Sequence, residues 1–139
     1  MAAAFFDSNI VVYAVDPRDD SDGKRSVARE LIRERDCVLS TQVLMEVFNV
    51  LVRLDLMDAA PAKGYVRRLC MFPIITIERG DVLEALELRD LYQIHHYDGL
   101  ILRAAAKSGV SMLYTEDLNH GQMYGPVRVC NPFIEDFLA

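Results

Sequence analysis

The amino-acid sequence predicts an α/β fold of three layers, in which helices cover both faces of a short, mainly parallel central sheet. Short apolar segments alternate along the chain with longer segments of helical spacing, and this alternation is typical of such sheets. The 139 residues suit one domain, which we expect to span residues 1–139. With 52% hydrophobic and 26% charged residues, the composition is that of a globular protein and argues against disorder.

The first part of the chain contains one predicted strand and two predicted helices. Residues 3–6 are an apolar run that stops at Asp7, and we expect them to form a buried strand. A short helix is expected over residues 8–15, where the following Asp-Pro pair would end it. Helical spacing of apolar residues predicts a second helix over residues 22–35. The polar segment 16–22 is expected to be mobile.

Two strands and two helices are predicted in the middle of the chain. Residues 37–39 are expected to form a short strand. Thr41 is the expected N-cap of a strongly periodic helix that runs to about residue 54. A further helix is expected over residues 59–72, and the segment 73–77, rich in β-branched residues, is expected to form the next strand.

The last third of the chain repeats the alternation of helices and strands. Two helices and two strands are predicted, over residues 79–93, 98–108, 111–114 and 127–129. Gly109 is expected to end the second of these helices. A terminal helical turn is expected over residues 133–138, and the segment 119–125 is expected to be mobile.

The charge balance is acidic. The chain has 15 basic and 21 acidic residues, for a net charge of −6, and its sequence pI is about 5.0. A protein that binds nucleic acid by neutralising phosphates is usually basic. If this protein acts on nucleic acid, another source of positive charge is needed, and metal ions are the obvious candidates.

Membrane and secretory classes are excluded by local features. Uncharged stretches such as residues 69–77 are far shorter than the roughly 20 apolar residues of a membrane-spanning helix. The N-terminus lacks a basic segment and meets a carboxylate at once, unlike a signal peptide. The three cysteines are widely spaced and form no zinc-binding pattern, and we expect them to be reduced thiols of a cytoplasmic protein.

Two carboxylates occupy informative positions in the predicted elements. Asp7 ends the first strand, at the carboxyl edge where parallel sheets bind ligands, although from this segment alone a helix N-cap is the preferred interpretation. Asp98 falls near the middle of the apolar face of its helix, so its carboxylate is expected to point inward. Burial of an unpaired carboxylate costs several kcal/mol. Asp98 therefore needs a cation, or else serves as an N-cap or pairs with an arginine.

Two further acids have weaker individual signals. Glu46 lies at the border of the apolar arc of its helix, where a solvated polar face explains it as well as a function does. Asp117 follows the strand at 111–114 and taken alone is a turn or cap residue. Together, the four acids come from four elements and are expected to gather at one edge of the sheet. Like charges so placed repel each other, and an all-oxygen donor set suits Mg²⁺ or Mn²⁺, which activate water in phosphodiester hydrolysis.

Four segments of the sequence contain these acids in a recognisable context: FDSN at residues 6–9, TQVLMEVFN at 41–49, YDGLILRAAA at 97–106 and LYTEDLN at 113–119. They resemble the PIN-domain family, in particular VapC-type toxins of bacterial toxin–antitoxin pairs. The tail over residues 121–133, a glycine-containing loop followed by a strand and Asn-Pro-Phe, also matches the family. The resemblance extends over essentially the whole chain and implies a PIN-like fold.

The resemblance implies a Mg²⁺-dependent, or Mn²⁺-dependent, endoribonuclease that acts as a toxin. By motif position, Asp7, Glu46, Asp98 and Asp117 would form the catalytic quartet. Asp7 and Asp98 most resemble direct metal ligands, with Asp117 as a further ligand and Glu46 in support. Thr115 matches a hydroxyl position that the family often places near the metal. The products would carry a 5′-phosphate and a 3′-hydroxyl.

The resemblance also implies partners and minor roles. An RNA substrate, a co-encoded VapB-like antitoxin and a second copy of the chain in a homodimer are expected. Glu116 would be at most a supporting residue, and Gly99 replaces the more usual alanine or serine, which is expected to loosen its helix start slightly. His95 and His96 are expected in a loop, with Tyr97 lining the RNA groove. The alternative is a catalytically weak PIN-like module that binds RNA or protein, which the intact quartet disfavours.

Overall fold

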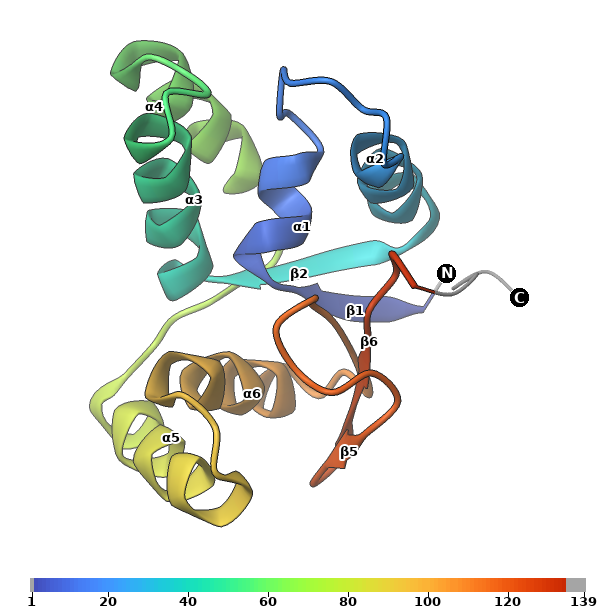
Figure 1. The fold of residues 1–139 in the computed structure, drawn as a ribbon. Coiled ribbons are helices and arrows are strands. Elements are labelled where there is room, and N and C mark those ends of the chain that lie inside the picture. The colour runs from blue at the N-terminus through green and yellow to red at the C-terminus, as the bar shows by residue number, and fades with distance from the viewer. Residues whose placement is uncertain (1, 135–139) are drawn as a thin grey trace.

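The central element of the computed structural model, which describes residues 2–134, is a six-stranded sheet (Figure 1). Its strands are β1 (Ala3–Phe6), β2 (Asp36–Ser40), β3 (Ile74–Ile75), β4 (Met112–Tyr114), β5 (Met123–Tyr124) and β6 (Val127–Cys130). They lie in the order β3-β2-β1-β4-β6-β5. Every neighbouring pair is parallel except β5 and β6. The prediction of a mainly parallel sheet is confirmed.

Helices cover both faces of this sheet. In the described part of the chain they are α1 (Ser8–Tyr13), α2 (Lys24–Glu34), α3 (Thr41–Arg53), α4 (Ala59–Leu69), α5 (Arg79–Tyr92) and α6 (His96–Ser108). Figure 1 shows α1 to α4 on one side of the sheet and α5 and α6 on the other. The predicted α/β/α layering is therefore confirmed. Among the residues that the structure describes, no helix has the length and apolar character to cross a membrane.

The pairing of β1 with β4 sets the position of the residues that follow both strands. Phe6 pairs with Tyr114, and the backbone amide of Asp7 donates a 3.0 Å hydrogen bond to the carbonyl oxygen of Tyr114. Because the two strands are parallel, their carboxyl ends meet at one edge of the sheet. Asp7 and Thr115 therefore emerge next to each other.

The hydrophobic core joins the sheet to both helical layers. Its largest fully buried side chains include Phe5, Phe6, Ile10, Leu31, Leu39, Leu51, Ile101 and Leu113. Full burial of one such side chain contributes about 1.5–3 kcal/mol to folding. Ile101 comes from the apolar face predicted for α6, and this face packs against the sheet, so that the first turn of α6 reaches the carboxyl edge.

The N-cap of α3 is Ser40 and not Thr41. Ser40 has extended backbone angles, and its hydroxyl accepts a 3.2 Å hydrogen bond from the amide of Val43. An N-cap residue requires such non-helical angles, which the last residue of β2 already has. The hydroxyl of Thr41 instead accepts a 3.1 Å hydrogen bond from the amide of Ile77, and this bond ties the start of α3 to the segment after β3.

Two further features differ from the sequence-based expectations. Helix α6 begins at His96 rather than Asp98, because the Nδ1 atom of His95 acts as the cap and accepts a 3.1 Å hydrogen bond from the amide of Tyr97. Histidine is an uncommon cap, so the usual start signal is missing. Strand β5 was not predicted. It lies within the segment 119–125 that was expected to be mobile, and it forms a hairpin with β6. The terminal turn predicted over 133–138 lies largely outside the described residues.

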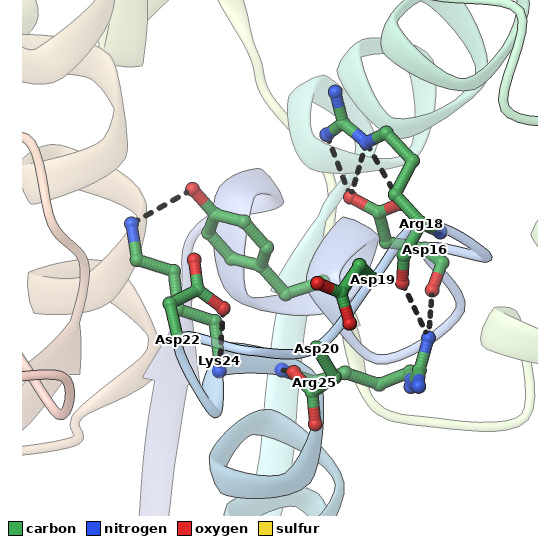
Figure 2. A pocket seen from close by; sticks show the side chains of 8 residues that line it. Asp16, Arg18, Asp19, Asp20, Asp22, Lys24 and Arg25 are labelled. Atoms are coloured by element: carbon green, nitrogen blue, oxygen red, sulfur yellow. Dashed lines mark hydrogen bonds and ion pairs between the residues drawn. The ribbon is translucent and has the colours of Figure 1, made fainter.

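The segment between α1 and α2 is held by its own charged side chains (Figure 2). Asp16 forms a 2.6 Å ion pair with Arg18, and Arg25 donates hydrogen bonds to the carbonyl oxygens of both residues. The carboxylate of Asp20 accepts a 2.8 Å hydrogen bond from the amide of Arg25. These bonds give the segment a defined conformation, where composition alone predicted mobility. The adjoining pocket of about 360 Å³ is lined by none of the four predicted acids.

Candidate metal centre

Asp7 combines a capping role with deep burial. It follows β1 and is the N-cap residue of α1. Its Oδ1 atom accepts a 2.7 Å hydrogen bond from the amide of Ser8, and its Oδ2 atom accepts one of the same length from the hydroxyl of Thr115. Only 3% of Asp7 is exposed, and burial raises its pKa to about 7. The charges of Glu46 and Asp117 also raise this pKa, whereas the two hydrogen bonds oppose the shift.

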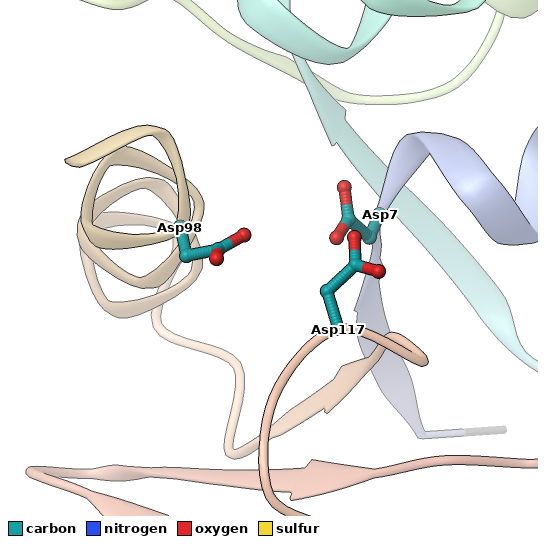
Figure 3. A group of neighbouring side chains, drawn as sticks. All are labelled: Asp7, Asp98 and Asp117. Carbon is teal, nitrogen blue, oxygen red and sulfur yellow. The ribbon is translucent and has the colours of Figure 1, made fainter. Parts of the chain in front are cut away.

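Asp98 lies in the first turn of α6 and points toward Asp7 and Asp117 (Figure 3). Its carboxylate is half-buried, and within residues 2–134 it has no hydrogen-bond or ion-pair partner. Neither the N-cap role nor the arginine pair considered for it is found, since His95 is the cap of α6. Burial raises the pKa of Asp98 to about 6, and the charge of Asp117 adds to the effect.

Asp117 approaches the same place from the loop that follows β4. It is exposed, and its Oδ2 atom accepts a 3.0 Å hydrogen bond from the side-chain amide of Asn9 on α1. Its backbone amide donates a 3.1 Å hydrogen bond to the hydroxyl of Thr115. Partial burial of the carboxylate and the charge of Glu116 raise the pKa of Asp117, while the Asn9 bond opposes this shift.

The three aspartates converge although they come from distant parts of the chain (Figure 3). One carboxylate oxygen from each lies within 4.8 Å of those of the other two. Oxygens on opposite sides of one Mg²⁺ lie about 4.2 Å apart, since each Mg–O bond is about 2.1 Å long. The all-oxygen donor set suits a small, hard divalent cation, and the 4.8 Å limit exceeds this Mg²⁺ separation only slightly. Such a cation would also relieve the repulsion that raises the pKa values of Asp7 and Asp98.

Glu46 stands outside this group of three. Its Oε2 atom accepts a 2.9 Å hydrogen bond from the hydroxyl of Ser8, and its Oε1 atom accepts a 2.6 Å hydrogen bond from the side-chain amide of Gln42. The hydroxyl of Ser8 also lies 3.4 Å from Oδ1 of Asp7, so one side chain separates Glu46 from the aspartates. The charge of Glu46 still contributes to the raised pKa values of Asp7 and Asp98.

Thr115 forms hydrogen bonds with both Asp7 and Asp117. It is fully buried. Its hydroxyl donates to Oδ2 of Asp7 and accepts hydrogen bonds from the backbone amide of Asp117 and, at 3.4 Å, from the side-chain amide of Asn9. Each donor and acceptor site of this hydroxyl is thus used. Thr115 orients the carboxylate of Asp7 and positions the backbone that carries Asp117 through these bonds.

Glu116 faces away from the three aspartates. Its carboxylate accepts a 2.7 Å hydrogen bond from the hydroxyl of Tyr13 and forms a 3.0 Å ion pair with Lys24. The Lys24 ammonium also lies 4.8 Å from the centre of the Tyr13 ring. These contacts anchor the loop that carries Asp117 to α1 and α2.

Three polar side chains of the site were given no role by sequence reasoning: Ser8, Asn9 and Gln42. Their spacing contained a signal, because Gln42 lies one helical turn before Glu46 and Asn9 shares the first turn of α1 with Ser8. In the described part of the chain, the amide oxygens of Asn9 and Gln42 are buried without a hydrogen-bond partner. Both are thus available to a bound group or to water at this edge.

Gly99 brings α6 into close contact with α5. It is buried, and a Cβ atom at this position would lie 2.5 Å from the carbonyl oxygen of Ala85. The expectation that glycine loosens the helix start is corrected by this geometry. The missing side chain lets the two helices approach, and their contact fixes the turn that carries Asp98.

Comparisons with known proteins agree with this fold. The family model described as "PIN domain" matches residues 4–126. Similar solved structures include a toxin–antitoxin complex from Klebsiella pneumoniae, with 22% identity, coverage of 83% of this chain and 89% of that chain, and a TM-score of 0.61. Mycobacterium tuberculosis VapC20, described as a toxin that cleaves the sarcin–ricin loop, has 18% identity, coverages of 80% and 87%, and a TM-score of 0.64.

A third similar structure is VapBC2 from Rickettsia felis, bound to a DNA fragment from the promoter of its own genes. It has 19% identity, covers 91% of this chain and 96% of that chain, and has a TM-score of 0.62. At these identities the likeness shows a shared fold. No curated protein matches the chain.

Proposed function

Because this chain belongs to the PIN-domain family, whose model matches residues 4–126, we propose that it is a Mg²⁺-dependent or Mn²⁺-dependent endoribonuclease. In this proposal it is the toxin of a toxin–antitoxin pair and acts in the cytoplasm. The observation that carries the proposal is the convergence of Asp7, Asp98 and Asp117, whose carboxylate oxygens lie within 4.8 Å of one another. Burial, with a smaller contribution from the neighbouring carboxylates, raises the pKa of Asp7 to about 7 and that of Asp98 to about 6, and a bound cation would favour their charged forms.

The three aspartates would hold the cation in this proposal, and their neighbours would keep them in place. When bound, a divalent cation would activate water for in-line attack on a phosphodiester bond and stabilise the leaving oxygen. Thr115 keeps the buried carboxylate of Asp7 turned toward the other two aspartates. Glu46, held by its hydrogen bonds with neighbouring side chains, completes the acidic quartet. The products would carry a 5′-phosphate and a 3′-hydroxyl.

A protein partner belongs to the same proposal. The solved structures with this fold include toxin–antitoxin complexes, one of them bound to promoter DNA. A co-encoded VapB-like antitoxin would lay its C-terminal segment across the acidic site and offer an arginine to the carboxylates. We also propose a homodimer as the active form. Co-purification with the product of an adjacent small gene would test the antitoxin, and sedimentation would test the dimer.

The enzymatic part is tested by cleavage of RNA with and without EDTA. Wild-type protein is expected to cleave with Mg²⁺ and to stop when EDTA is added, and Asp7→Asn is expected to abolish cleavage. We call Asp7, Asp98 and Asp117 the acidic group. Asp19→Asn is the matched control, because Asp19 is an exposed aspartate outside this group. Cleavage by Asp7→Asn at the wild-type rate would refute the assignment. A wild-type protein that binds RNA with Mg²⁺ but does not cut it would support the binding-module alternative.

A further inference from the structure

Three exposed aromatic rings adjoin the acidic group. We call His95, His96 and Tyr97 the ring cluster. The centroids of the two imidazoles lie 4.0 Å apart at an interplanar angle of 30°, and the Tyr97 ring lies 4.6 Å from that of His96 and 5.5 Å from that of His95. All three residues are exposed, Tyr97 to 58%. An exposed group of mutually contacting rings offers aromatic surface that can accept another ring.

The backbone beneath the ring cluster is held in position. The Nδ1 atom of His95 caps α6 through its hydrogen bond with the amide of Tyr97. From α3, the side-chain amide of Gln42 donates a 3.3 Å hydrogen bond to the carbonyl oxygen of Tyr97 and a 2.6 Å bond to Glu46. The backbone that carries the rings therefore needs little ordering when they bind a partner, which lowers the entropic cost of binding.

Tyr97 of the ring cluster and Asp98 of the acidic group are neighbours in the first turn of α6, and their side chains point in different directions. Tyr97 directly precedes Asp98, so their Cα atoms are about 3.8 Å apart. Successive side chains of a helix diverge by about 100°. Asp98 points toward Asp7 and Asp117 (Figure 3), whereas the ring of Tyr97 is exposed to solvent. A group bound at the carboxylates would thus have an aromatic surface immediately beside it.

From this geometry we infer that the ring cluster stacks with the base of an RNA nucleotide next to the phosphodiester held at the acidic group, an inference that rests on the proposed function. Bases stack on aromatic side chains without regard to charge, which suits a chain with a net charge of −6. A base can reach an exposed ring only when it leaves a double helix. The inferred contact therefore requires a nucleotide whose base is unpaired.

Binding of abasic oligoribonucleotides tests the stacking contact. Full-length protein is titrated with a fluorescently labelled single-stranded oligoribonucleotide, and with a series that lacks one base at successive positions. Ca²⁺ replaces Mg²⁺ so that binding is measured without cleavage. For the wild-type protein, loss of one particular base is expected to weaken binding about 5-fold to 100-fold, the range for base–aromatic stacking.

Variants of Tyr97 then connect that base with the ring cluster. Tyr97→Ala is expected to weaken binding of the unmodified RNA by a similar factor and to abolish the effect of the missing base, whereas Tyr97→Phe keeps both. Leu83→Ala on α5 is the matched control, because Leu83 is an apolar residue with a similar exposed fraction, 60% against 58%, and does not belong to the ring cluster. It is expected to bind like the wild type.

Two results would overturn the inference. In the first, Tyr97→Ala weakens the binding of intact RNA and the binding of abasic RNA by the same factor. This result would mean that no base contacts the Tyr97 ring. In the second, Tyr97→Ala leaves RNA binding unchanged and weakens a complex with a protein partner, so that the ring cluster is a protein interface. Failure of the proposed function has a separate sign, namely absence of Mg²⁺-dependent cleavage by a wild-type protein that still shows the base-specific effect.

Discussion

The hydroxyl of Thr115 donates a 2.7 Å hydrogen bond to Oδ2 of Asp7, across 108 residues of sequence. Both residues directly follow parallel strands, β4 and β1, so the bond joins the two strand ends at the carboxyl edge of the sheet. Burial raises the pKa of Asp7 to about 7, and the bond opposes this shift because it stabilises the charged form of the carboxylate. The bond therefore supports the side chain that the proposed metal site depends on most.

Replacement of Thr115 by valine is expected to weaken the metal site. Thr115→Val keeps the shape of the side chain and removes its hydrogen bond to Asp7, which should raise the pKa of Asp7 further. We expect Mg²⁺ affinity or the cleavage rate to fall about 10-fold to 100-fold, as for other groups that orient a metal ligand. Calorimetric titration with Mg²⁺ measures the affinity. Thr115→Ser, which keeps the hydroxyl, should stay near the wild type, and equal losses in both variants would contradict the role of the bond.

The stability of the metal-free protein is expected to fall as the pH rises. The pKa of Asp7 is raised from 3.8 to about 7 in the folded protein, so the folded state binds this proton more tightly than the unfolded state. Its stabilising contribution is complete below about pH 4 and is lost as the pH rises through 7. At about 1.4 kcal/mol per pKa unit, the loss amounts to at most about 4 kcal/mol.

Comparison with Asp7→Asn isolates this effect. Urea unfolding in EDTA, measured from pH 5 to 8, should show the wild type losing stability relative to Asp7→Asn as the pH rises. Added Mg²⁺ should restore stability to the wild type alone, because only the charged carboxylate binds it. Parallel pH profiles for the two proteins would contradict the raised pKa of Asp7.

Addition of one methyl group at Gly99 is expected to disturb the contact between α5 and α6. The new Cβ would lie 2.5 Å from the carbonyl oxygen of Ala85, so the helices must separate. Gly99→Ala should lower the free energy of unfolding by about 1–3 kcal/mol, as overpacking does, and should reduce cleavage by displacing Asp98. Gly64→Ala on α4 is the control, because no atom lies within 4 Å of the position that its new methyl group would take. It should stabilise the protein by about 0.5–1 kcal/mol.

An ion-pair network around the buried Asp81 joins the first turn of α5 to the second half of α6. Asp81 on α5 is 2% exposed and accepts hydrogen bonds from Lys107 at 2.8 Å and from Arg103 at 2.9 Å. The Lys107 bond is the main reason that the pKa of Asp81 is lowered to about 2. Because the folded pKa lies below 3.8, the contribution to stability is present above about pH 4 and is lost as the pH falls through 2.

Asp81→Asn is therefore expected to destabilise the protein at neutral pH. Both partners are about one-third exposed, and after solvent screening the loss should be about 1–2 kcal/mol. Urea unfolding at pH 7 measures it, and the difference from wild type should shrink when the pH is lowered toward 2. Glu84→Gln, at an exposed position on the same helix, should cause no comparable loss. A difference that persists unchanged at low pH would contradict the ion-pair explanation.

Much of this fold follows from local properties of the sequence. Apolar runs and helical periodicity predict the parallel strands and the six helices, because each pattern reflects the burial of one face. The order of strands and helices also places Asp7 and Asp117 at a carboxyl edge before any coordinates are known. Strand β5 and the start of α6 at His96 escaped prediction, since the first is two residues long and the second depends on an imidazole cap.

Only the tertiary structure decided which acids lie together and in what electrostatic state. Distances between side chains on α1, α6 and the loop after β4 depend on strand register and on how closely α6 packs against α5, and neither is encoded in local periodicity. That packing brings Asp98 to Asp7 and Asp117, while Ser8 stands between Asp7 and Glu46. The raised pKa values have the same origin, because burial is a property of the assembled elements and not of any one segment.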